Sequence, residues 1–528
     1  MLHLIALVFA IPFLYVLYVA VLSYYNAWQY NRKAAARACK PAALRPYKYP
    51  AGIDMIMRVM DADKRHQIPN EFERLFFDEL AGKSTLRMYL FGTLILSTVE
   101  PENIKAILAT QFEDFELGPV RRGNFFPMLG NGIFTADGKD WQHGRALLRP
   151  QFARNQVADL DLEERHVSDM LQHMPINKST GWTDEINLQP IFFRLTLDSA
   201  TEFLFGESVH SQISALPTSA TEKDSLRNLT GLDLIEVGKA FDRATHMLGK
   251  RARFAENYWM YNPRQFKEDC ALIHKFADFF VNRALHSDVE KQEGEKYVFL
   301  DELAKATRDP IEIRSQLLNI FLAGRDTTAG LLGWVFFVLC RHPDIFEKLR
   351  AQIIEEFGTY EKPRNISFAT LKSCTYLQHV MNETLRLYPS VPLNGRRAVR
   401  DTTIPLGGGP DGKSPVFVPE GTPIEYSVHI MHRRKDIWGE DAWEFKPERW
   451  VGRKGGWEFL PFNGGPRICL GQQFALTEAG YVIVRLLQKF DKIENLSAVT
   501  EQRESVQYQY SVTTAPWEVT LRMREAKN

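Results

Sequence analysis

The sequence predicts a mainly α-helical fold with a small β part. Helical periodicity dominates from Pro150 to Pro389. Glycine, proline and β-branched residues are instead concentrated near Thr402–Glu425 and Gln507–Leu521, which favours strands and turns there. The chain has 528 residues, 45% of them hydrophobic, and no linker rich in Gly, Ser or Pro divides its body. We therefore expect one large helical domain over residues 51–528.

The N-terminus differs from the rest of the chain in composition. The first 31 residues contain no Asp, Glu, Lys or Arg, and Leu4–Leu22 is almost wholly apolar. About 20 such residues span a bilayer as a helix. Basic residues come only after this stretch, at Arg32, Lys33, Arg37 and Lys40, whereas a signal peptide carries them first. We therefore expect a single-pass anchor over residues 1–30, a basic, proline-rich hinge over residues 31–50, and a cytosolic body.

Four glycosylation sequons favour the opposite topology, at Asn177, Asn228, Asn365 and Asn495. Such triplets are frequent by chance, and a cytosolic body leaves them unused. The five cysteines are scattered singly, which is typical of a reducing compartment without a disulfide framework. Lys plus Arg and Asp plus Glu number 65 each, so no bulk charge attracts nucleic acid.

The segment Phe462-Asn-Gly-Gly-Pro-Arg-Ile-Cys-Leu-Gly471 places a single cysteine, Cys469, in a loop of glycines with Arg467 two positions before it. A thiolate needs nearby positive charge or backbone amides to stay ionised. Glycines let the loop turn tightly enough to aim amides at the sulfur, and Gly471 permits close approach of a flat partner. A structural zinc site needs four protein ligands, whereas a lone thiolate suits the axial position of a haem iron.

A second motif, Ala323-Gly-Arg-Asp-Thr-Thr-Ala-Gly330, interrupts an apolar stretch from about Glu312 to Arg341. The stretch is too apolar for a surface helix, so we expect a central helix there. Thr327 is placed to hydrogen-bond the carbonyl of Ala323 and open the helix locally, which would leave room for dioxygen and water beside Asp326. The alternative is a core helix with a kink.

Both motifs resemble those of the cytochrome P-450 haem-thiolate monooxygenases, and the resemblance covers roughly Pro41–Met523. It implies the fold of that family and a haem b bound by the thiolate of Cys469. Thr327 and Asp326 match the residues that manage proton delivery to oxygen, and Ala323 and Gly324 the helix residues beside the haem. The haem loop is expected to contribute Phe462, Arg467 and Gly471.

Further haem contacts follow from the resemblance. Trp141 and Arg145 lie four residues apart, on one side of a helix. In the family this pair faces a haem propionate, and Arg396 and Arg467 match other propionate positions. Arginine suits carboxylates because its planar fork pairs bidentately.

A structural network is expected away from the haem. Glu383 and Arg386 lie three residues apart and resemble the buried Glu–Arg–Arg network of the family, with Arg449 as its third member. The bland alternative is a solvated surface pair. His143, His429 and His432 are not spaced like metal ligands, and we expect surface or packing roles for them.

Within the family, the chain is most similar to fungal microsomal enzymes that hydroxylate n-alkanes and fatty acids. The stretches that carry this similarity include Leu129–Gly138, Leu148–Phe152, Tyr388–Pro392, Gly407–Gly412 and Met431–Asp436. Gly395 departs from that group, which is bulkier there. By match to substrate-contacting stretches, the pocket candidates are Phe125, Phe126, Ile320, Val391, Leu393, Val512 and Thr513.

The resemblance implies partners as well as chemistry. The chain has no nucleotide-binding glycine motif, so electrons from NADPH must come through NADPH-cytochrome P-450 reductase, with cytochrome b5 as a further donor. We expect the endoplasmic reticulum membrane, a lipophilic substrate and no nucleic acid. Alternatives are a monooxygenase of another lipophile (terpenoid, polyketide or xenobiotic), a haem-thiolate isomerase or dehydratase, and a non-catalytic haem protein.

Overall fold

The computed structural model describes residues 21, 25, 27–49, 52–80, 82–152, 160–216, 231–286 and 297–527. Most of the predicted anchor therefore lies outside the described residues. Within the described part, no single helix has both the length and the apolar character to cross a bilayer; only the pair Pro310–Leu339 and Pro343–Phe357, bent by 115°, meets both criteria together.

The chain forms two compact units. Unit 1 comprises Met1–Asp54, Leu75–Glu116 and Gly395–Tyr426. Unit 2 comprises Met55–Arg74, Leu117–Asn394 and Ser427–Asn528.

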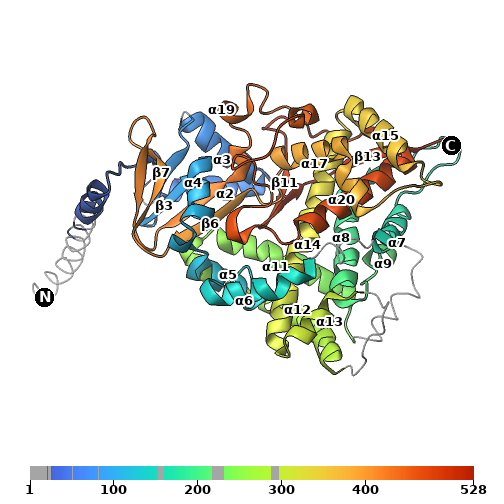
Figure 1. Cartoon of the computed structure of the whole chain (residues 1–528), viewed down its shortest axis with the longest axis horizontal. Coiled ribbons are helices and arrows are strands. Elements are labelled where there is room, and N and C mark those ends of the chain that lie inside the picture. Colours follow the sequence, from blue (N-terminus) through green and yellow to red (C-terminus); the bar gives the residue numbers. More distant parts are fainter. Residues whose placement is uncertain are drawn as a thin grey trace, which may run out of the picture. The chain divides into compact units, whose positions relative to one another are not determined.

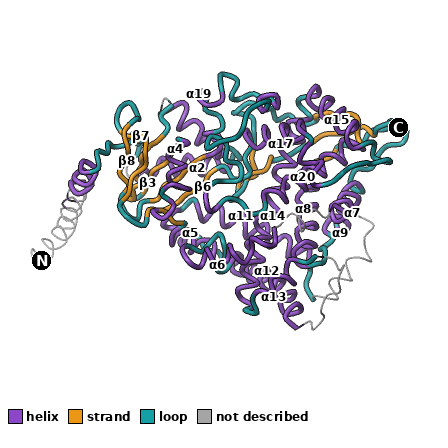
Figure 2. Tube along the Cα trace, in the orientation of Figure 1, coloured by secondary structure: helices purple, strands orange, loops and turns teal. Residues whose placement is uncertain are grey.

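Unit 1 holds most of the β structure. Its six-stranded sheet has the order β1-β2-β3-β9-β6-β4, and β7 pairs with β8 in a separate ribbon. Figure 2 shows β3, β6, β7 and β8 in orange. The strands are β1 (Ala43–Leu44), β2 (Thr85–Leu90), β3 (Thr93–Thr98), β4 (Phe115–Glu116), β6 (Leu393–Ala398), β7 (Thr402–Gly408), β8 (Ser414–Val418) and β9 (Pro423–Ser427). The short helices are α4 (Pro101–Lys105), η2 (Arg74–Glu79), η3 (Ala106–Thr110) and η4 (Phe112–Asp114).

Local chemistry explains the β2–β3 hairpin. Its two-residue loop, Phe91 and Gly92, has φ of 48° and 84°, the positive values that a tight hairpin turn requires. The fully buried Asn103 donates hydrogen bonds to Thr85 Oγ1 (3.0 Å) and Thr98 Oγ1 (3.1 Å), one on each strand. A buried amide of this kind fixes the strand register because its polar atoms must be paired.

Unit 2 is the helical part of the chain. Its long helices are α2 (Ile53–Lys64), α5 (Gly118–Leu129), α6 (Gly138–Leu148), α7 (Leu160–Leu171), α8 (Leu188–Phe205), α11 (Leu234–Ala252), α12 (Arg264–His286), α13 (Phe299–Ala306), α14 (Pro310–Leu339), α15 (Pro343–Phe357), α17 (Thr375–Leu387) and α20 (Gln472–Lys489). Its short helices are α3 (Ile68–Glu73), η5 (Arg149–Phe152), α9 (Ser211–Ser214), η6 (Ala255–Met260), α16 (Phe368–Ser373), α18 (Val428–Met431), α19 (Lys435–Trp438), η7 (Pro447–Trp450) and η8 (Gly465–Arg467).

The helix α14 is the core of unit 2. It begins where the Asp309 carboxylate accepts hydrogen bonds from the amides of Ile311 (2.9 Å) and Glu312 (3.4 Å), with Pro310 as its first residue. Nearly every side chain from Ile313 onward is buried, as the apolar sequence predicted. Helices α8, α12, α17 and α20 pack around it, and Figure 1 shows α8 and α20 beside it. Its bounds lie two residues before the predicted ones.

Two small sheets complete unit 2: a three-stranded sheet of order β10-β13-β5 and the ribbon β11–β12. The strands are β5 (Ile186–Asn187), β10 (Phe490–Asn495), β11 (Tyr508–Tyr510), β12 (Thr514–Pro516) and β13 (Thr520–Glu525). Strand β12 packs against α14 at Gly330, where an added Cβ would lie 2.5 Å from the carbonyl oxygen of Thr514. The glycine is therefore required by the close approach of another backbone.

Candidate active site

The cysteine loop, Phe462–Gly471, contains η8 and precedes α20, and Cys469 lies between these two helices. Its turn contains two residues with positive φ, Asn463 (63°) and Gly465 (68°). The amide of Cys469 donates a hydrogen bond to the carbonyl of Phe462 (3.1 Å), which closes the loop. Cys469 is exposed, whereas the other four cysteines of the chain are buried. The sulfur predicted to bind iron is thus the accessible one.

The surroundings of Cys469 fit an axial thiolate. Desolvation raises the pKa of the thiol above its ordinary value, while the backbone amide of Gly471 and the charge of Arg145 act in the opposite direction. Among the described residues, no three His, Cys, Asp or Glu side chains group as metal ligands. A metal bound here would need its other ligands from outside the chain, as a porphyrin provides them.

Three predicted haem-contact residues form one cluster at this loop. Arg467 donates hydrogen bonds to Asp137 Oδ1 (2.7 Å) and to the carbonyl of Ala136 (3.1 Å). Its guanidinium lies 4.3 Å from the ring centroid of Trp141. Arg145, one turn after Trp141 on α6, donates to the carbonyl of Ile468 beside the cysteine (3.1 Å).

Arg396, the fourth residue predicted to contact a haem propionate, belongs to unit 1. It is buried on β6 and donates a hydrogen bond to the carbonyl of Gly395 (2.7 Å).

One face of α14 is only partly buried by the protein. Ala323, Gly324 and Thr327 are half-buried in a helix that is otherwise buried around them, and their spacing puts them on one side. A Cβ added at Gly324 would meet nothing within 4 Å. The Thr327 hydroxyl donates to the carbonyl of Ala323 (2.7 Å), the predicted hydrogen bond. The helix nevertheless continues through this position, so the predicted local opening is not seen.

The charges of the central motif are arranged around Asp326. Burial raises the pKa of its carboxyl to about 6, although Arg325, 3.4 Å away, lowers it. Arg325 also pairs with Asp242 on α11 and lies between the rings of Phe193 (5.8 Å) and Phe241 (5.6 Å). Arg325 is therefore engaged with neighbouring helices.

Two pocket candidates, Val391 and Thr513, are chain neighbours of residues that are hydrogen-bonded near Thr327. Ser390 donates its hydroxyl hydrogen to the carbonyl of Thr327 (3.1 Å) and accepts at its own carbonyl from the amide of Thr514 (2.9 Å). The chain neighbours of these two residues include Val391 and Thr513. Val391, Leu393, Val512 and Thr513 are half-buried, Phe125 and Ile320 are buried in one core cluster, and Phe126 is 44% exposed.

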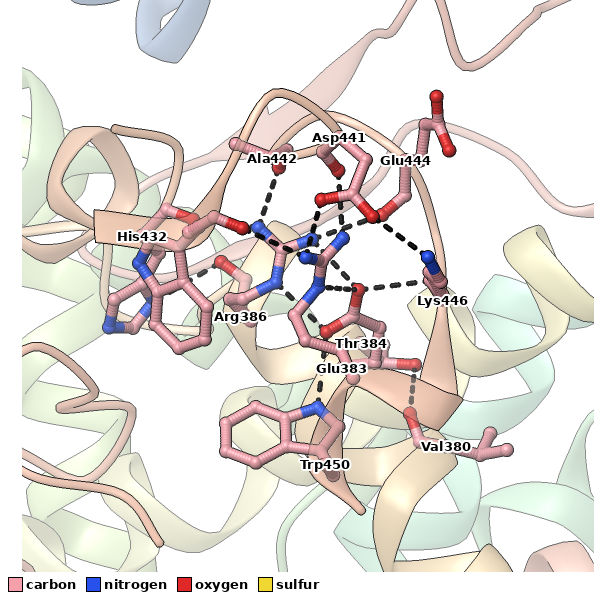
Figure 3. A network of polar contacts seen from close by, with 12 residues as sticks. Val380, Glu383, Thr384, Arg386, His432, Asp441, Ala442, Glu444, Lys446 and Trp450 are labelled. Atoms are coloured by element: carbon pink, nitrogen blue, oxygen red, sulfur yellow. Dashed lines mark hydrogen bonds and ion pairs between the residues drawn. The ribbon is translucent and has the colours of Figure 1, made fainter. Parts of the chain in front are cut away.

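The Glu383–Arg386–Arg449 network is fully formed in the structure (Figure 3). Arg386 donates to both carboxylate oxygens of Glu383 at 2.9 and 2.8 Å, and neither side chain is exposed. Arg449 adds a contact of 3.2 Å, and the Trp450 indole donates to the same carboxylate (3.1 Å). The surface-pair alternative is thus wrong, because these charges are buried and multiply bonded.

Sequence reasoning missed the polar residues around this network. His432 accepts at Nε2 from the amide of Leu460 (3.0 Å), and its carbonyl accepts from Arg386 (2.7 Å). His429 lies 2.6 Å from Glu73, which also pairs with Arg433 (3.1 Å). Both histidines are buried hydrogen-bonding residues and not surface residues. Only the contact of His429 with Arg433 (3.0 Å), four residues on, is local; the other partners come from distant segments or are backbone groups.

The chain is similar in sequence and in fold to known proteins. A sequence model described as Cytochrome P450 matches residues 49–515. The chain is 51% identical over 490 residues to "Cytochrome P450 monooxygenase g430" of Fusarium sp (91% of this chain, 84% of the relative). It is 51% identical over 420 residues to "Cytochrome P450 52A5" of Candida maltosa (78% and 77%). The crystal structure of the cytochrome P450DA heme domain has a TM-score of 0.71 at 20% identity, covering 93% of this chain and 98% of that one.

Proposed function

Because the chain belongs to the cytochrome P450 family and is a haem-thiolate monooxygenase, we propose that it hydroxylates n-alkanes or fatty acids at or near the chain end. The observation that carries the proposal is the partly buried face of α14, where Thr327 lies beside apolar half-buried residues. The resemblance of the motif stretches to fungal alkane and fatty-acid hydroxylases supports the substrate class.

The residues that would hold the haem are those of the cysteine-loop cluster. Cys469 would be the iron ligand, and Trp141, Arg145 and Arg467 would lie at its propionate edge. Haem ligated by a thiolate supplies the electron push that favours O–O cleavage.

Two residues of α14 would handle protons. The hydroxyl of Thr327 is held by Ala323 with its oxygen lone pairs free to accept a hydrogen bond. Asp326, with its pKa near 6, exchanges protons easily close to neutral pH. A carboxyl with an ordinary pKa would stay ionised there and release protons less readily.

The surroundings favour an uncharged chain. Arg325, the basic residue of the central motif, is already paired with Asp242 and Asp326. An apolar channel then orients a lipid mainly by burial, at about 0.8 kcal/mol per methylene.

The electron donor and the cellular location are proposed from the family and from the composition of the N-terminus. A monooxygenase of this family takes electrons from a redox partner, which we propose is NADPH-cytochrome P-450 reductase, with cytochrome b5 as a possible second donor. We also propose attachment to the endoplasmic reticulum membrane by residues 1–30, with the body in the cytosol. The sequence asymmetry of the N-terminus supports this topology.

Reconstitution with a reductase and a graded panel of alkanes and fatty acids tests the proposal. We expect affinity to rise with chain length until the channel is filled, with terminal and subterminal alcohols formed together. Turnover of polycyclic or aromatic substrates alone, with no chain-length trend in binding, would instead favour a monooxygenase of another lipophile.

A further inference from the structure

Asp137 begins helix α6, but its side chain binds two other segments of unit 2. An aspartate at this position usually accepts a hydrogen bond from the first amides of its own helix. Within the described part of the chain, the carboxylate makes no such bond; Oδ1 accepts from the amide of Leu117 (2.9 Å) and Oδ2 from that of Gly118 (3.0 Å). Oδ1 also accepts from Arg467 (2.7 Å). One carboxylate therefore joins the starts of two helices to the loop of Cys469.

The turn into α5 has the geometry of an anion-binding site, and Asp137 fills it. Leu117 is in the right-handed helical region (φ −68°, ψ −39°), and Gly118 has φ of 85°. Successive residues in these two conformations aim their amides toward one point, a geometry that binds anions. The positive φ favours glycine at this position. A negative charge at the start of α5 also complements the helix dipole.

Helix α5 carries two proposed substrate contacts, Phe125 and Phe126, between two attachment points. At its end, the carbonyl of Leu129 accepts a hydrogen bond from the side chain of Asn319 on α14 (3.1 Å). At its start, Asp137 holds the first amides. Loss of the attachment at the start would therefore let the helix shift together with its aromatic side chains.

Arg467 connects the same carboxylate to the cysteine loop. The Arg467 side chain is 9% exposed and that of Asp137 is 22% exposed. Solvent screens a partly buried ion pair of this kind much less than a surface pair. The Arg467 guanidinium also lies 4.3 Å from the ring centroid of Trp141 on α6. The position of α5 is thus tied to the segment that contains the proposed iron ligand, Cys469.

We propose that Asp137 is a positioning residue that determines where along a lipid chain oxygen is inserted. Its carboxylate is engaged by three protein donors, so it acts through α5 and not on the substrate itself. Terminal C–H bonds are stronger than internal ones, so attack at the chain end requires a closely held substrate. A loosened α5 should therefore favour subterminal products. The inference rests on the proposed function, because Phe125 and Phe126 are substrate contacts only within it.

Asp137→Asn in the full-length holoenzyme tests this, because the amide keeps one oxygen acceptor but loses the charge and the second acceptor. Dodecane and dodecanoate are supplied with a reductase, and the ratio of terminal to subterminal alcohols is measured by gas chromatography. We expect this ratio to fall by about threefold to tenfold, because small displacements at a reacting carbon change rates strongly. Misfolding alone would lower the yield but would leave the product ratio of the folded molecules unchanged.

Two further variants separate positioning from a general loss of stability. Gly118→Ala strains the same turn from the α5 side and leaves Asp137 and Arg467 unchanged, so it should shift the ratio in the same direction. Asp491→Asn is the matched control, since it breaks a partly exposed ion pair with Arg524 (2.8 Å) between β10 and β13. The control should keep the wild-type product ratio.

Hydrogen exchange measured by mass spectrometry gives a second readout that needs no substrate. Residues 118–129 should exchange faster in Asp137→Asn than in the wild type, because the attachment at the start of α5 is lost. The same residues should exchange at the wild-type rate in Asp491→Asn.

Each result decides one question. An unchanged product ratio or unchanged exchange of α5 in Asp137→Asn overturns the role of Asp137, and so does an equal shift of the ratio in Asp491→Asn. Failure of the wild type to convert either lipid overturns the proposed function instead, while exchange still shows whether Asp137 holds α5. If Asp137→Asn does not fold, the product ratio of Gly118→Ala gives the answer.

Discussion

At the residue scale, Cys469 is classed as exposed as a residue, while desolvation of its thiol raises the thiol pKa. Its thiol is the exposed one of five, and its pKa is raised by burial against the opposing effects of Arg145 and the Gly471 amide. A metal cation at the sulfur favours the thiolate, because ligation requires deprotonation. The charge of Arg145 and the Gly471 amide do not outweigh desolvation, so the thiol pKa stays raised.

Replacing Cys469 by alanine should abolish the red-shifted Soret band of the reduced, carbon-monoxide-bound protein, because that band reports thiolate ligation. Absorption spectroscopy of purified protein measures it. Cys374→Ala, at a buried cysteine, should keep the band. Retention of the band in Cys469→Ala would remove this residue as the ligand.

Thr327→Ala should preserve haem content and substrate binding while product per NADPH consumed falls and peroxide rises. The hydroxyl that handles protons would be lost, but α14 would remain continuous, since its backbone does not depend on that side chain. Simultaneous assays of NADPH, peroxide and product measure the coupling. Thr328→Ala, at the buried adjacent position, is the matched control. Unchanged coupling in Thr327→Ala would place the oxygen site elsewhere.

At the element scale, buried ion pairs and hydrogen bonds join helices of unit 2 to distant loops. Glu383 and Arg386 on α17 bind backbone groups between His432 and Lys446, including the carbonyl of Ala442 (2.6 Å) and the amide of Lys446 (3.0 Å). His429 on α18 is similarly fixed to Glu73 on α3. Both clusters are buried, so the loss of one member leaves an unpaired charge.

Glu383→Ala should lower the free energy of unfolding by about 3–5 kcal/mol and give little holoprotein, because Arg386 would be left buried without its carboxylate. Denaturant unfolding and haem content measure the effect. Glu268→Ala provides the comparison, since the Arg264–Glu268 pair is largely exposed and is worth less than about 1 kcal/mol. Normal stability and haem content in Glu383→Ala would show that the network is dispensable.

Acidification should lower the free energy of unfolding through His429. Burial lowers the pKa of His429 to about 4, so this histidine is neutral in the folded protein and binds a proton more readily when unfolded. Its contribution to stability is complete above pH 6.5 and is lost as the pH falls toward 4. Between pH 6.5 and 5 the loss is about 2 kcal/mol.

Urea unfolding of wild type and of His429→Gln at both pH values tests this. The variant should lose about 2 kcal/mol less than the wild type between them. An equal loss in the two proteins would mean that His429 does not titrate in this way.

At the scale of the whole molecule, the chain separates into a β-rich unit and a helical unit, preceded by an apolar N-terminus. The proposed cysteine ligand and the oxygen-handling residues all belong to unit 2. None of these proposed haem-ligand and oxygen-handling residues belongs to the N-terminal segment.

Removal of residues 1–31 should therefore release much of the protein from membranes and leave the carbon-monoxide spectrum intact. Membrane fractionation with alkaline wash, followed by absorption spectroscopy, measures both. Full retention on membranes would reveal a second attachment surface. Glycosylation of the full-length protein at its sequons would reverse the proposed topology.

The sequence predicted best what is encoded locally. The bond from Thr327 to Ala323 spans one helical turn, and the Glu383–Arg386 pair spans three residues, so both follow from spacing and resemblance. The hairpin of Thr85–Leu90 and Thr93–Thr98 went unpredicted although its pairing is local, because its turn residues Phe91 and Gly92 are not the Asn-Gly or Asp-Gly pair that marks such a turn in a sequence. The partners of His432 are largely backbone groups, which are the same for every residue type and leave no mark on the sequence.

Gly324 and Gly330 of the central motif differ in the space that the protein leaves for a side chain. At Gly324 no protein atom lies within 4 Å of the position that a methyl group would take. At Gly330 the Thr514 carbonyl already occupies the position that a methyl group would need. A mutagenesis library aimed at regioselectivity should therefore leave position 330 unchanged.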